Sequence, residues 1–197
     1  IMLTTALIAL DSTVIATAVP TVVKDLGGFS QFPWLFSVYL LTQAVTVPVY
    51  GKLADMLGRK PVLAFGVLVF VGASLLCGLA WSMPALIAAR ALQGIGAGGV
   101  LPIGVTIIGD LYSVEERARV QGYVASVWGI SSVLGPTLGG LFSEYGSWRW
   151  IFFVNLPLGA FALVVLQRRF TEVVERRSHQ IDYVGAGLLT VGCSLLI

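Results

Sequence analysis

Six long apolar runs constrain what this chain can fold into more than any other feature of its sequence. They lie at about residues 2–23, 34–56, 61–81, 84–108, 119–143 and 148–167, with charged residues in the breaks between them. An α-helix needs about 20 apolar residues to cross the hydrocarbon core of a bilayer. The pattern predicts an all-α integral membrane protein with six transmembrane helices, and an apolar run from Tyr183 predicts the start of a seventh.

Composition agrees with a membrane protein and argues against several other classes. Charged residues make up 11% of the chain and hydrophobic residues 57%, whereas about 25% of a soluble domain is charged. A net charge of +2 is too small to indicate a nucleic-acid partner. His179 is the only histidine, and Cys77 and Cys193 lack metal-ligand spacing, so we expect no metal site. We also expect no cofactor and no enzymatic activity, because no hydrolase triad or phosphate-binding loop is recognisable.

Basic residues in the breaks indicate how the helices are oriented. One side carries Lys24 and Arg149, and the other carries nine basic residues: Lys52, Arg59, Lys60, Arg117, Arg119, Arg168, Arg169, Arg176 and Arg177. The positive-inside rule then puts the first residues and the loops after the second, fourth and sixth helices in the cytoplasm. Four tryptophans are expected in the aromatic belt of the outer interface: Trp34, Trp81, Trp148 and Trp150.

The chain begins and ends within apolar sequence, which suggests a longer polypeptide. The last run offers roughly 15 residues, fewer than the ~20 that a spanning helix needs. We expect a six-helix bundle over residues 1–168, a cytoplasmic linker over 169–182 and a truncated seventh helix over 183–197.

Asp11 stands in the middle of the first run, about 12 residues before Lys24. That is ~18 Å below the outer surface at ~1.5 Å per residue, near the middle of a ~30 Å hydrocarbon core. A carboxylate there costs about 2.5–3.5 kcal/mol, and burial favours its neutral form, so the group is suited to binding and releasing a proton. The alternative is a fixed ion pair with Arg90, or a carboxylate held by Ser12 or Thr13, that only joins helices.

Arg90 lies about six residues into the fourth run, or ~9 Å below the outer interface. A guanidinium does not lose its proton in proteins, so Arg90 is not the proton carrier. Close to Asp11 it would favour the ionised carboxylate, and separation of the two would favour proton uptake. The alternative is that its side chain extends to the outer interface.

Further polar residues occupy helix faces that we expect to line a cavity or to pack on the first helix. The second run has a stripe at i, i+4, i+7 and i+11, made of Tyr39, Gln43, Thr46 and Tyr50. Gln93 lies one turn beyond Arg90. Trp128 lies deep in the fifth run and either stacks on a flat or cationic ligand or packs on lipid or a neighbouring helix. Asn155 is expected to satisfy backbone groups that Pro157 leaves unpaired, with contact to a substrate as the alternative.

Glycines of the fourth and fifth runs predict close helix packing. A G-x-G-x-x-G match from Gly94 to Gly99 lies inside an apolar run, so we reject a dinucleotide site. The spacing of Gly94 and Gly98 instead allows two helix backbones to approach, and Gly135 and Gly139 repeat it. The fifth run combines four glycines with a proline, which predicts a kinked, close-packed helix that either gates or simply packs: Gly129, Gly135, Pro136, Gly139 and Gly140.

The break over residues 51–63, GKLADMLGRKPVL, has the residues of a tight, charged turn. Gly51 and Gly58 permit close approach and a sharp turn. Asp55 and Arg59 are four residues apart, so they can pair, and both could meet Asp110 at the end of the fourth run. The alternative is a solvated loop that only orients the protein.

Five ordered stretches, and a sixth near the end of the chain, resemble the major facilitator superfamily. GKLADMLGRKP is similar to its motif A, RALQGIGAGG to motif B, and GISSVLGPTLGG to motif C, which is associated with antiporters. LDSTVIATAVP and SWRWIFFVNLPLG resemble the fourteen-helix drug:proton antiporter branch of QacA-like and EmrB-like exporters, and IDYVGAGLLTVG resembles the start of that branch's extra central helices.

The resemblance implies the N-terminal half of a transporter, with 3+3 inverted repeats, that rocks against a C-terminal half around a midplane cavity. It implies a protonation and cation-recognition site at Asp11 and a part in proton coupling for Arg90. It also implies a gating role for the fifth-run glycines and a cytoplasmic latch formed by Gly51, Asp55, Gly58, Arg59 and Asp110.

We therefore expect a proton-coupled antiporter of the plasma membrane that exports amphipathic or cationic organic compounds. Its expected partners are protons, a small-molecule substrate, the lipid bilayer and the C-terminal half of the same polypeptide. Export of a lipid or an endogenous metabolite on the same scaffold stays open, as does proton-coupled uptake. A non-transporting receptor or subunit is a further alternative, against which Asp11 and Arg90 argue.

Overall fold

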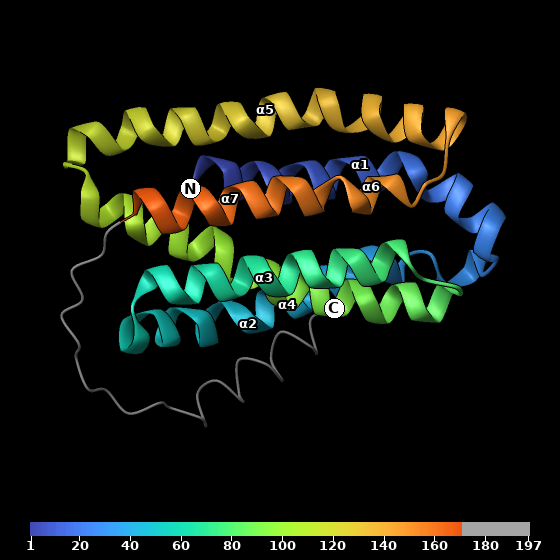
Figure 1. The fold of residues 1–197 in the computed structure, drawn as a ribbon, viewed down its shortest axis with the longest axis horizontal. Coiled ribbons are helices and arrows are strands. Elements are labelled where there is room, and N and C mark those ends of the chain that lie inside the picture. Colours follow the sequence, from blue (N-terminus) through green and yellow to red (C-terminus); the bar gives the residue numbers. More distant parts are fainter. Residues whose placement is uncertain (171–197) are drawn as a thin grey trace.

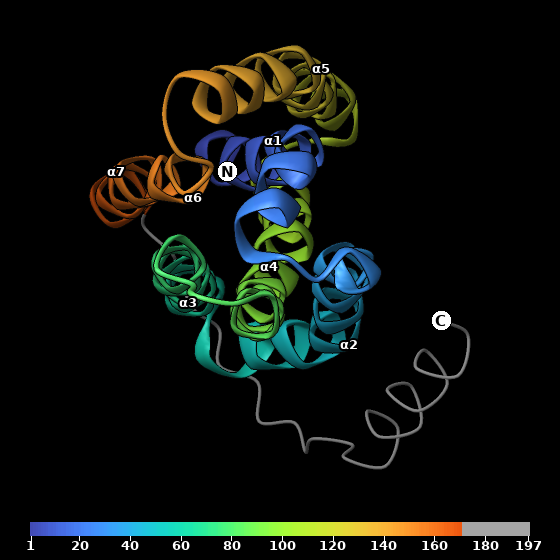
Figure 2. The same ribbon diagram turned by 90° about the vertical axis from the view of Figure 1, so that its right-hand side faces the viewer.

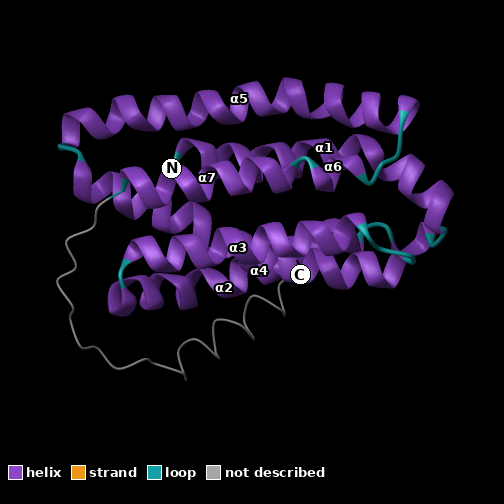
Figure 3. Cartoon of the chain, in the orientation of Figure 1, coloured by secondary structure: helices purple, strands orange, loops and turns teal. Residues whose placement is uncertain are grey.

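The computed structural model describes residues 1–170, which form a bundle of α-helices joined by short connections (Figure 1, Figure 3). The helices in chain order are α1 (Met2–Leu26), the 3₁₀ helix η1 (Phe29–Gln31), α2 (Trp34–Leu57), α3 (Arg59–Gly78), α4 (Met83–Leu111), α5 (Val114–Tyr145), α6 (Trp150–Phe153) and α7 (Asn155–Arg169). The expected seventh transmembrane helix over 183–197, and residues 171–182 of the expected linker, lie outside the described residues.

Within residues 1–170, six helical segments are long and apolar enough to cross a membrane, as predicted. The sixth runs from Trp150 to Arg168 and includes both α6 and α7. Pro157 has no N–H to donate to the carbonyl of Phe153, and α6 ends at Phe153. The all-α fold of the sequence prediction is confirmed.

Local sequence chemistry sets several helix ends. Gly58 separates α2 from α3 with a φ of 98°, a left-handed conformation that glycine adopts at little steric cost. The Ser82 hydroxyl accepts a hydrogen bond from the Ala85 N–H at the start of α4. Ser113 and Glu116 form a reciprocal capping box at the start of α5. These turns bring consecutive long helices back in opposite directions (Figure 1).

The six spans form two triplets that pack on each other. The first triplet is α1, α2 and α3, and the second is α4, α5 and the single span made of α6 and α7. The first helix of each triplet packs on the second helix of the other, α1 on α5 and α2 on α4 (Figure 2). The third helix α3 packs on α4 and α7. This exchange of partners agrees with the predicted 3+3 repeats and places α4 at the centre of the bundle, where residues along most of its length are buried.

Glycine makes the contact between α2 and α4 possible. A Cβ atom added at Gly94 would lie 2.1 Å from the Thr42 Oγ1, and one at Gly98 would lie 2.1 Å from the Thr46 Oγ1. Real Cβ atoms do not approach other heavy atoms that closely. The predicted close packing around Gly94 and Gly98 is therefore present, and its partner is a pair of threonines one turn apart.

The contact between α1 and α5 repeats this arrangement, again with glycines from the second triplet and threonines from the first. A Cβ atom at Gly135 or Gly139 of α5 would lie 2.0 Å from the Thr13 Oγ1 or the Thr17 Oγ1 of α1, respectively. The second triplet thus supplies the glycines to both interfaces, and the first triplet supplies the threonines.

The start of α1, the α2–α3 and α4–α5 connections and the end of α7 gather at one end of the bundle, on the left in Figure 1. We call this the basic end, because its described residues include Lys52, Arg59, Lys60, Arg117, Arg119 and Arg168. At the opposite end, Trp34, Trp81 and Trp150 are exposed. Trp148 is not part of that exposed group, because it is buried and its indole N–H donates to the Asp25 carboxylate at 2.8 Å. The indole N–H has a partner there, so the ring can be buried without an unpaired polar group.

Candidate functional site

A cluster of polar side chains occupies the interior of the bundle. Its members come from α1, α3, α4 and α7, and none is more than 1% exposed: Asp11, Ser74, Arg90, Gln93 and Asn155. We call these five residues the polar cluster. Buried polar groups cost free energy unless they are hydrogen-bonded, and buried charges cost more unless they are paired.

Asp11 is fully engaged through its two carboxylate oxygens. Its Oδ2 accepts from the Arg90 guanidinium at 2.6 Å. Its Oδ1 accepts from the Gln93 amide at 2.8 Å and from the Asn155 amide at 2.9 Å. Three donors therefore converge on one carboxylate, one from the guanidinium of Arg90 and two from side-chain amides.

Arg90 has partners of its own besides Asp11. One guanidinium nitrogen also donates to the Gln93 Oε1 at 2.6 Å, and the Nε donates to the Leu35 carbonyl at 3.4 Å. The guanidinium carbon lies 4.1 Å from the centre of the Tyr39 ring, a distance at which the ring face attracts a cation. The side chain is 1% exposed, so it does not extend to the interface.

Ser74 of α3 joins the polar cluster through two side-chain amides. Its Oγ accepts from the Gln93 amide at 2.6 Å and from the Asn155 amide at 3.1 Å. The neighbouring Cys77 thiol donates to the Gln93 Oε1 at 3.7 Å. Four helices therefore meet in one hydrogen-bonded network around a buried ion pair.

The structure brings Asp11 and Arg90 together, as the sequence suggested, and it adds Gln93, which was expected to line a cavity. Ser12 and Thr13 do not supply the carboxylate's partners. The Thr13 hydroxyl donates to the backbone carbonyls of Ala9, Leu10 and Ser131. The Thr13 hydroxyl therefore stabilises the packing of α1 on α5 and does not hydrogen-bond Asp11.

Ser74 was not among the residues that the sequence singled out, and the prediction that Asn155 satisfies backbone groups near Pro157 is wrong. The Asn155 amide donates to Asp11 and Ser74 instead of to backbone groups near Pro157. A usable signal was present, because Asn155 is the only asparagine of the chain and lies in an apolar span. Polar side chains inside a membrane span face the bundle interior, but that rule does not say which side chain they meet.

The polar stripe of α2 packs mainly on α4 and only Tyr39 reaches the polar cluster. The Tyr50 ring lies against Gly99, where an added Cβ would be 2.5 Å from the nearest ring atom. The Gln43 carbonyl and the Thr46 hydroxyl lie against Gly98. Packing on α4 replaces the expected packing on the first helix.

Trp128 lies on α5, which contributes no side chain to the polar cluster. It is 38% exposed. The structure therefore places this expected cavity residue at the surface of the described bundle.

At the basic end, the expected pairing between Arg59 and Asp110 is present as an ion pair. It joins the first turn of α3 to the last turn of α4. Gly58 makes the tight turn before it. Asp55 is exposed at the end of α2, and a Cβ at Gly51 would meet no atom within 4 Å in the described bundle.

The five expected gating residues of α5 divide between two faces. Gly135 and Gly139 pack on α1, whereas added Cβ atoms at Gly129 and Gly140 would meet nothing within 4 Å. Pro136 is exposed, and α5 continues through it without interruption.

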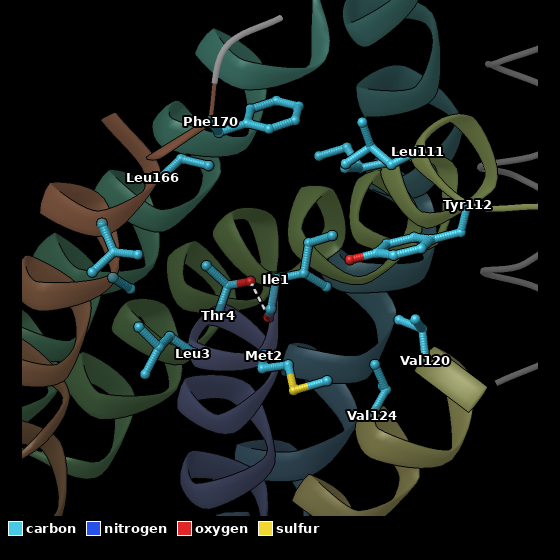
Figure 4. Close-up of a pocket in the computed structure, with 13 residues that line it drawn as sticks. Ile1, Met2, Leu3, Thr4, Leu111, Tyr112, Val120, Val124, Leu166 and Phe170 are labelled. Carbon is cyan, nitrogen blue, oxygen red and sulfur yellow. Dashed lines mark hydrogen bonds between the residues drawn. The ribbon is translucent and has the colours of Figure 1, made fainter. Parts of the chain in front are cut away.

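Figure 4 shows an apolar cavity of about 260 Å³ at the basic end, between the start of α1, the end of α4, the start of α5 and α7. Its lining includes Ile1, Thr4, Leu111, Tyr112, Val120 and Phe170. The expected cavity residues of α2 do not line it, nor does the polar cluster.

Comparison with known proteins gives a consistent result along the whole chain. The sequence profile of the Major Facilitator Superfamily matches residues 1–191. Multidrug resistance protein 3 of Bacillus subtilis is 44% identical over 189 residues, which are 96% of this chain and 37% of that protein. The multidrug transporter protein MdtP of the same organism is 41% identical over 96% of this chain and 35% of its own length.

A solved structure shares the fold. The human organic anion transporter MFSD10 (TETRAN) aligns with a TM-score of 0.78 and 19% sequence identity, over 95% of this chain and 51% of that one. The chain thus spans about half of that structure and little more than a third of the two bacterial relatives.

Proposed function

The chain belongs to the Major Facilitator Superfamily, and from this premise we propose that it is the N-terminal half of a proton-coupled exporter of amphipathic or cationic organic compounds. The names of the two Bacillus relatives, a multidrug resistance protein and a multidrug transporter, support export of several compounds. The six apolar helices make it a multi-pass membrane protein.

The observation that carries the proposal is the buried ion pair between Asp11 and Arg90. A charged pair inside a membrane-spanning bundle is costly, and such groups commonly mark an ion or substrate pathway. Four helices hold this pair in the interior of the half-transporter. Major facilitator sites lie near the bilayer midplane, where one half meets the other.

The proposed cycle exchanges a proton for a cationic substrate at Asp11. A proton on the Asp11 carboxyl removes the attraction to Arg90 and allows the pair to separate. A cationic substrate then favours the ionised carboxylate and releases the proton, since a nearby positive charge stabilises that form. Arg90 acts as the positive charge that restores the ionised state between substrates.

The remaining expected sites take supporting roles in this proposal. The Arg59–Asp110 ion pair, with Asp55, Gly51 and Gly58, forms the latch at the basic end. The face of α5 that carries Gly129, Pro136 and Gly140 meets the C-terminal half as a gate, while Gly135 and Gly139 belong to the bundle.

The organisation of the whole polypeptide completes the proposal. The α2 stripe, Gln93 and Trp128 border the substrate path between the halves. A bundle over residues 1–168 is followed by a linker over 169–182 and a seventh helix from residue 183, in a plasma-membrane protein whose basic end faces the cytoplasm.

The test uses the full polypeptide in proteoliposomes that contain a pH-sensitive dye. Addition of tetraphenylphosphonium, a lipophilic cation, is expected to drive proton movement in the wild type, and Asp11→Asn is expected to abolish it. Asp25→Asn is the matched control, because it removes a carboxylate from the last turn of the same helix, and it should retain proton movement. Equal proton movement in Asp11→Asn and the wild type would show that the carrier lies elsewhere.

A further inference from the structure

The two partners of the buried ion pair are held by largely separate sets of groups. Asp11 Oδ2 faces Arg90, whereas Oδ1 faces the amides of Gln93 and Asn155. The Asn155 amide continues to the Ser74 Oγ at 3.1 Å. Neither Asn155 nor Ser74 shares a hydrogen bond with Arg90 among the contacts of the polar cluster, so both belong to the Asp11 side alone.

From this division we propose that Asn155 and Ser74 are positioning residues that hold Asp11 while Arg90 leaves it, and so determine the pH at which the site takes up its proton. The inference rests on the proposed proton-coupled function and adds two residues to it. Asn155 contacts Asp11 directly, and Ser74 acts through the Asn155 and Gln93 amides.

Arg90 also keeps partners of its own when it separates from Asp11. The Gln93 Oε1, the Leu35 carbonyl and the Tyr39 ring remain as its partners without Asp11. Separation of a buried ion pair is strongly unfavourable when it leaves a charge without compensation. Here each partner keeps its own contacts, which makes the pair separable.

Gln93 cannot hold Asp11 independently of Arg90, because it lies three residues from Arg90 on α4 and binds it through Oε1. A displacement of α4 would carry Gln93 and Arg90 together. Asn155 comes from α7 and Ser74 from α3. The contact of Asn155 with Asp11, and that of Ser74 with Asn155, therefore do not depend on the position of α4.

The surroundings of Asp11 contain few other groups whose charge could change. Arg90 faces it from α4, Tyr39 from α2 and Cys77 from α3. The residues of α5 buried against α1 are neutral, namely Ser131, Gly135 and Gly139. Ile151 and Phe152, the buried residues of α6, are apolar, and α7 supplies the neutral Asn155 amide.

The test measures proton release when tetraphenylphosphonium binds to the purified full-length protein, over a range of pH in weakly buffered detergent solution. Asn155→Leu keeps the approximate size of the side chain but removes one of the two donors to Oδ1. Loss of a donor to the charged form favours protonation, so the pH of half-maximal release should rise by about one unit. Ser74→Ala should move it in the same direction by a smaller amount.

Cys77→Ala is the matched control, because Cys77 lies one turn from Ser74 on α3, is equally buried and contacts Gln93 but not Asn155. Its half-release pH should equal that of the wild type. The inference is overturned if Asn155→Leu and Ser74→Ala both release protons at the wild-type pH, or if Cys77→Ala shifts the curve as much as Ser74→Ala.

Two further outcomes distinguish a failure of the proposed function from a failure of the positioning inference. If the wild type binds the cation without releasing protons at any pH, the proposed proton-coupled function fails, and the positioning inference fails with it. If Asn155→Leu does not yield folded protein, the half-release pH of Ser74→Ala is compared with that of Cys77→Ala, and this comparison alone tests the inference.

Discussion

Gly98 shows how the absence of a side chain at one residue permits the close contact of two helices, α2 and α4. The nearest atoms to a Cβ at this position would be the Thr46 Oγ1 at 2.1 Å and the Gln43 carbonyl oxygen at 2.8 Å. One of these atoms belongs to the backbone of α2, so the clash cannot be relieved by a rotamer change alone. The approach of α2 to α4 therefore depends on glycine at this residue.

Gly98→Ala is expected to lower the free energy of unfolding by about 1–3 kcal/mol, the usual cost of overpacking a well-packed interior. Gly109→Ala, on the same helix, is the matched control, because a Cβ there meets nothing within 4 Å. The control should be neutral or slightly stabilising, since alanine favours a helix over glycine by about 1 kcal/mol. Thermal unfolding of the detergent-solubilised protein compares the two, and equal midpoints would contradict the tight contact.

At the scale of the elements, the ends of α1 and α4 are tied down in corresponding ways. Asp25 and Asp110 are each the residue before the last of their helix. Asp110 pairs with Arg59, at the start of α3, and Asp25 pairs with Arg149, next to the start of α6. The two ion pairs lie at opposite ends of the bundle, as inverted repeats require (Figure 1).

The Arg149 pair also fixes the connection between α5 and α6. Arg149 donates to Asp25 at 3.0 Å and to the Ala80 carbonyl at 3.1 Å, and it stacks on the buried Trp148. The Asp25 side chain is 50% exposed, so the ion pair itself adds only about 0–1 kcal/mol to global stability. Its main effect is local, because it keeps the segment between α5 and α6 ordered.

Arg149→Gln is therefore expected to change hydrogen exchange more than global stability. Amides around residues 146–150 should exchange faster by several-fold, while the melting midpoint changes little. Lys24→Gln provides the comparison, because it removes a positive charge from the same end of the bundle. Unchanged exchange in Arg149→Gln would mean that Trp148 packing alone holds the connection.

At the scale of the whole molecule, the distribution of charge supports one orientation in the membrane. Most of the described basic residues gather where α1 begins and α7 ends, and the exposed tryptophans Trp34, Trp81 and Trp150 lie at the other end. Loops with an excess of lysine and arginine stay in the cytoplasm, and tryptophan is enriched at membrane interfaces.

Single cysteines in an otherwise cysteine-free full-length protein test this orientation. Trp81→Cys, at a position that is 82% exposed, is expected to react with a membrane-impermeant maleimide added to intact cells. Glu115→Cys, at the exposed start of α5, should react only after the cells are permeabilised. The reverse pattern would overturn the orientation.

Several features followed from the sequence because they depend on local properties of the chain. Apolar length identifies a spanning helix without reference to its neighbours, and this predicted all six spans. The cost of charge in a bilayer singled out Asp11 and Arg90, and the charged turn suggested that Arg59 could meet Asp110. Gly94 and Gly98 predicted a close contact but not the helix that makes it.

The tertiary structure alone decided which side chains meet across the bundle. Helical periodicity says which residues share a face, but the partner of that face depends on how all six spans pack. Ser74, Asn155 and Asp11 therefore meet although they are more than 60 residues apart in sequence. For the same reason Trp148 was expected at the interface and lies buried on Asp25. The sequence by itself determined which residues are costly in a membrane, and the packing determined which groups compensate that cost.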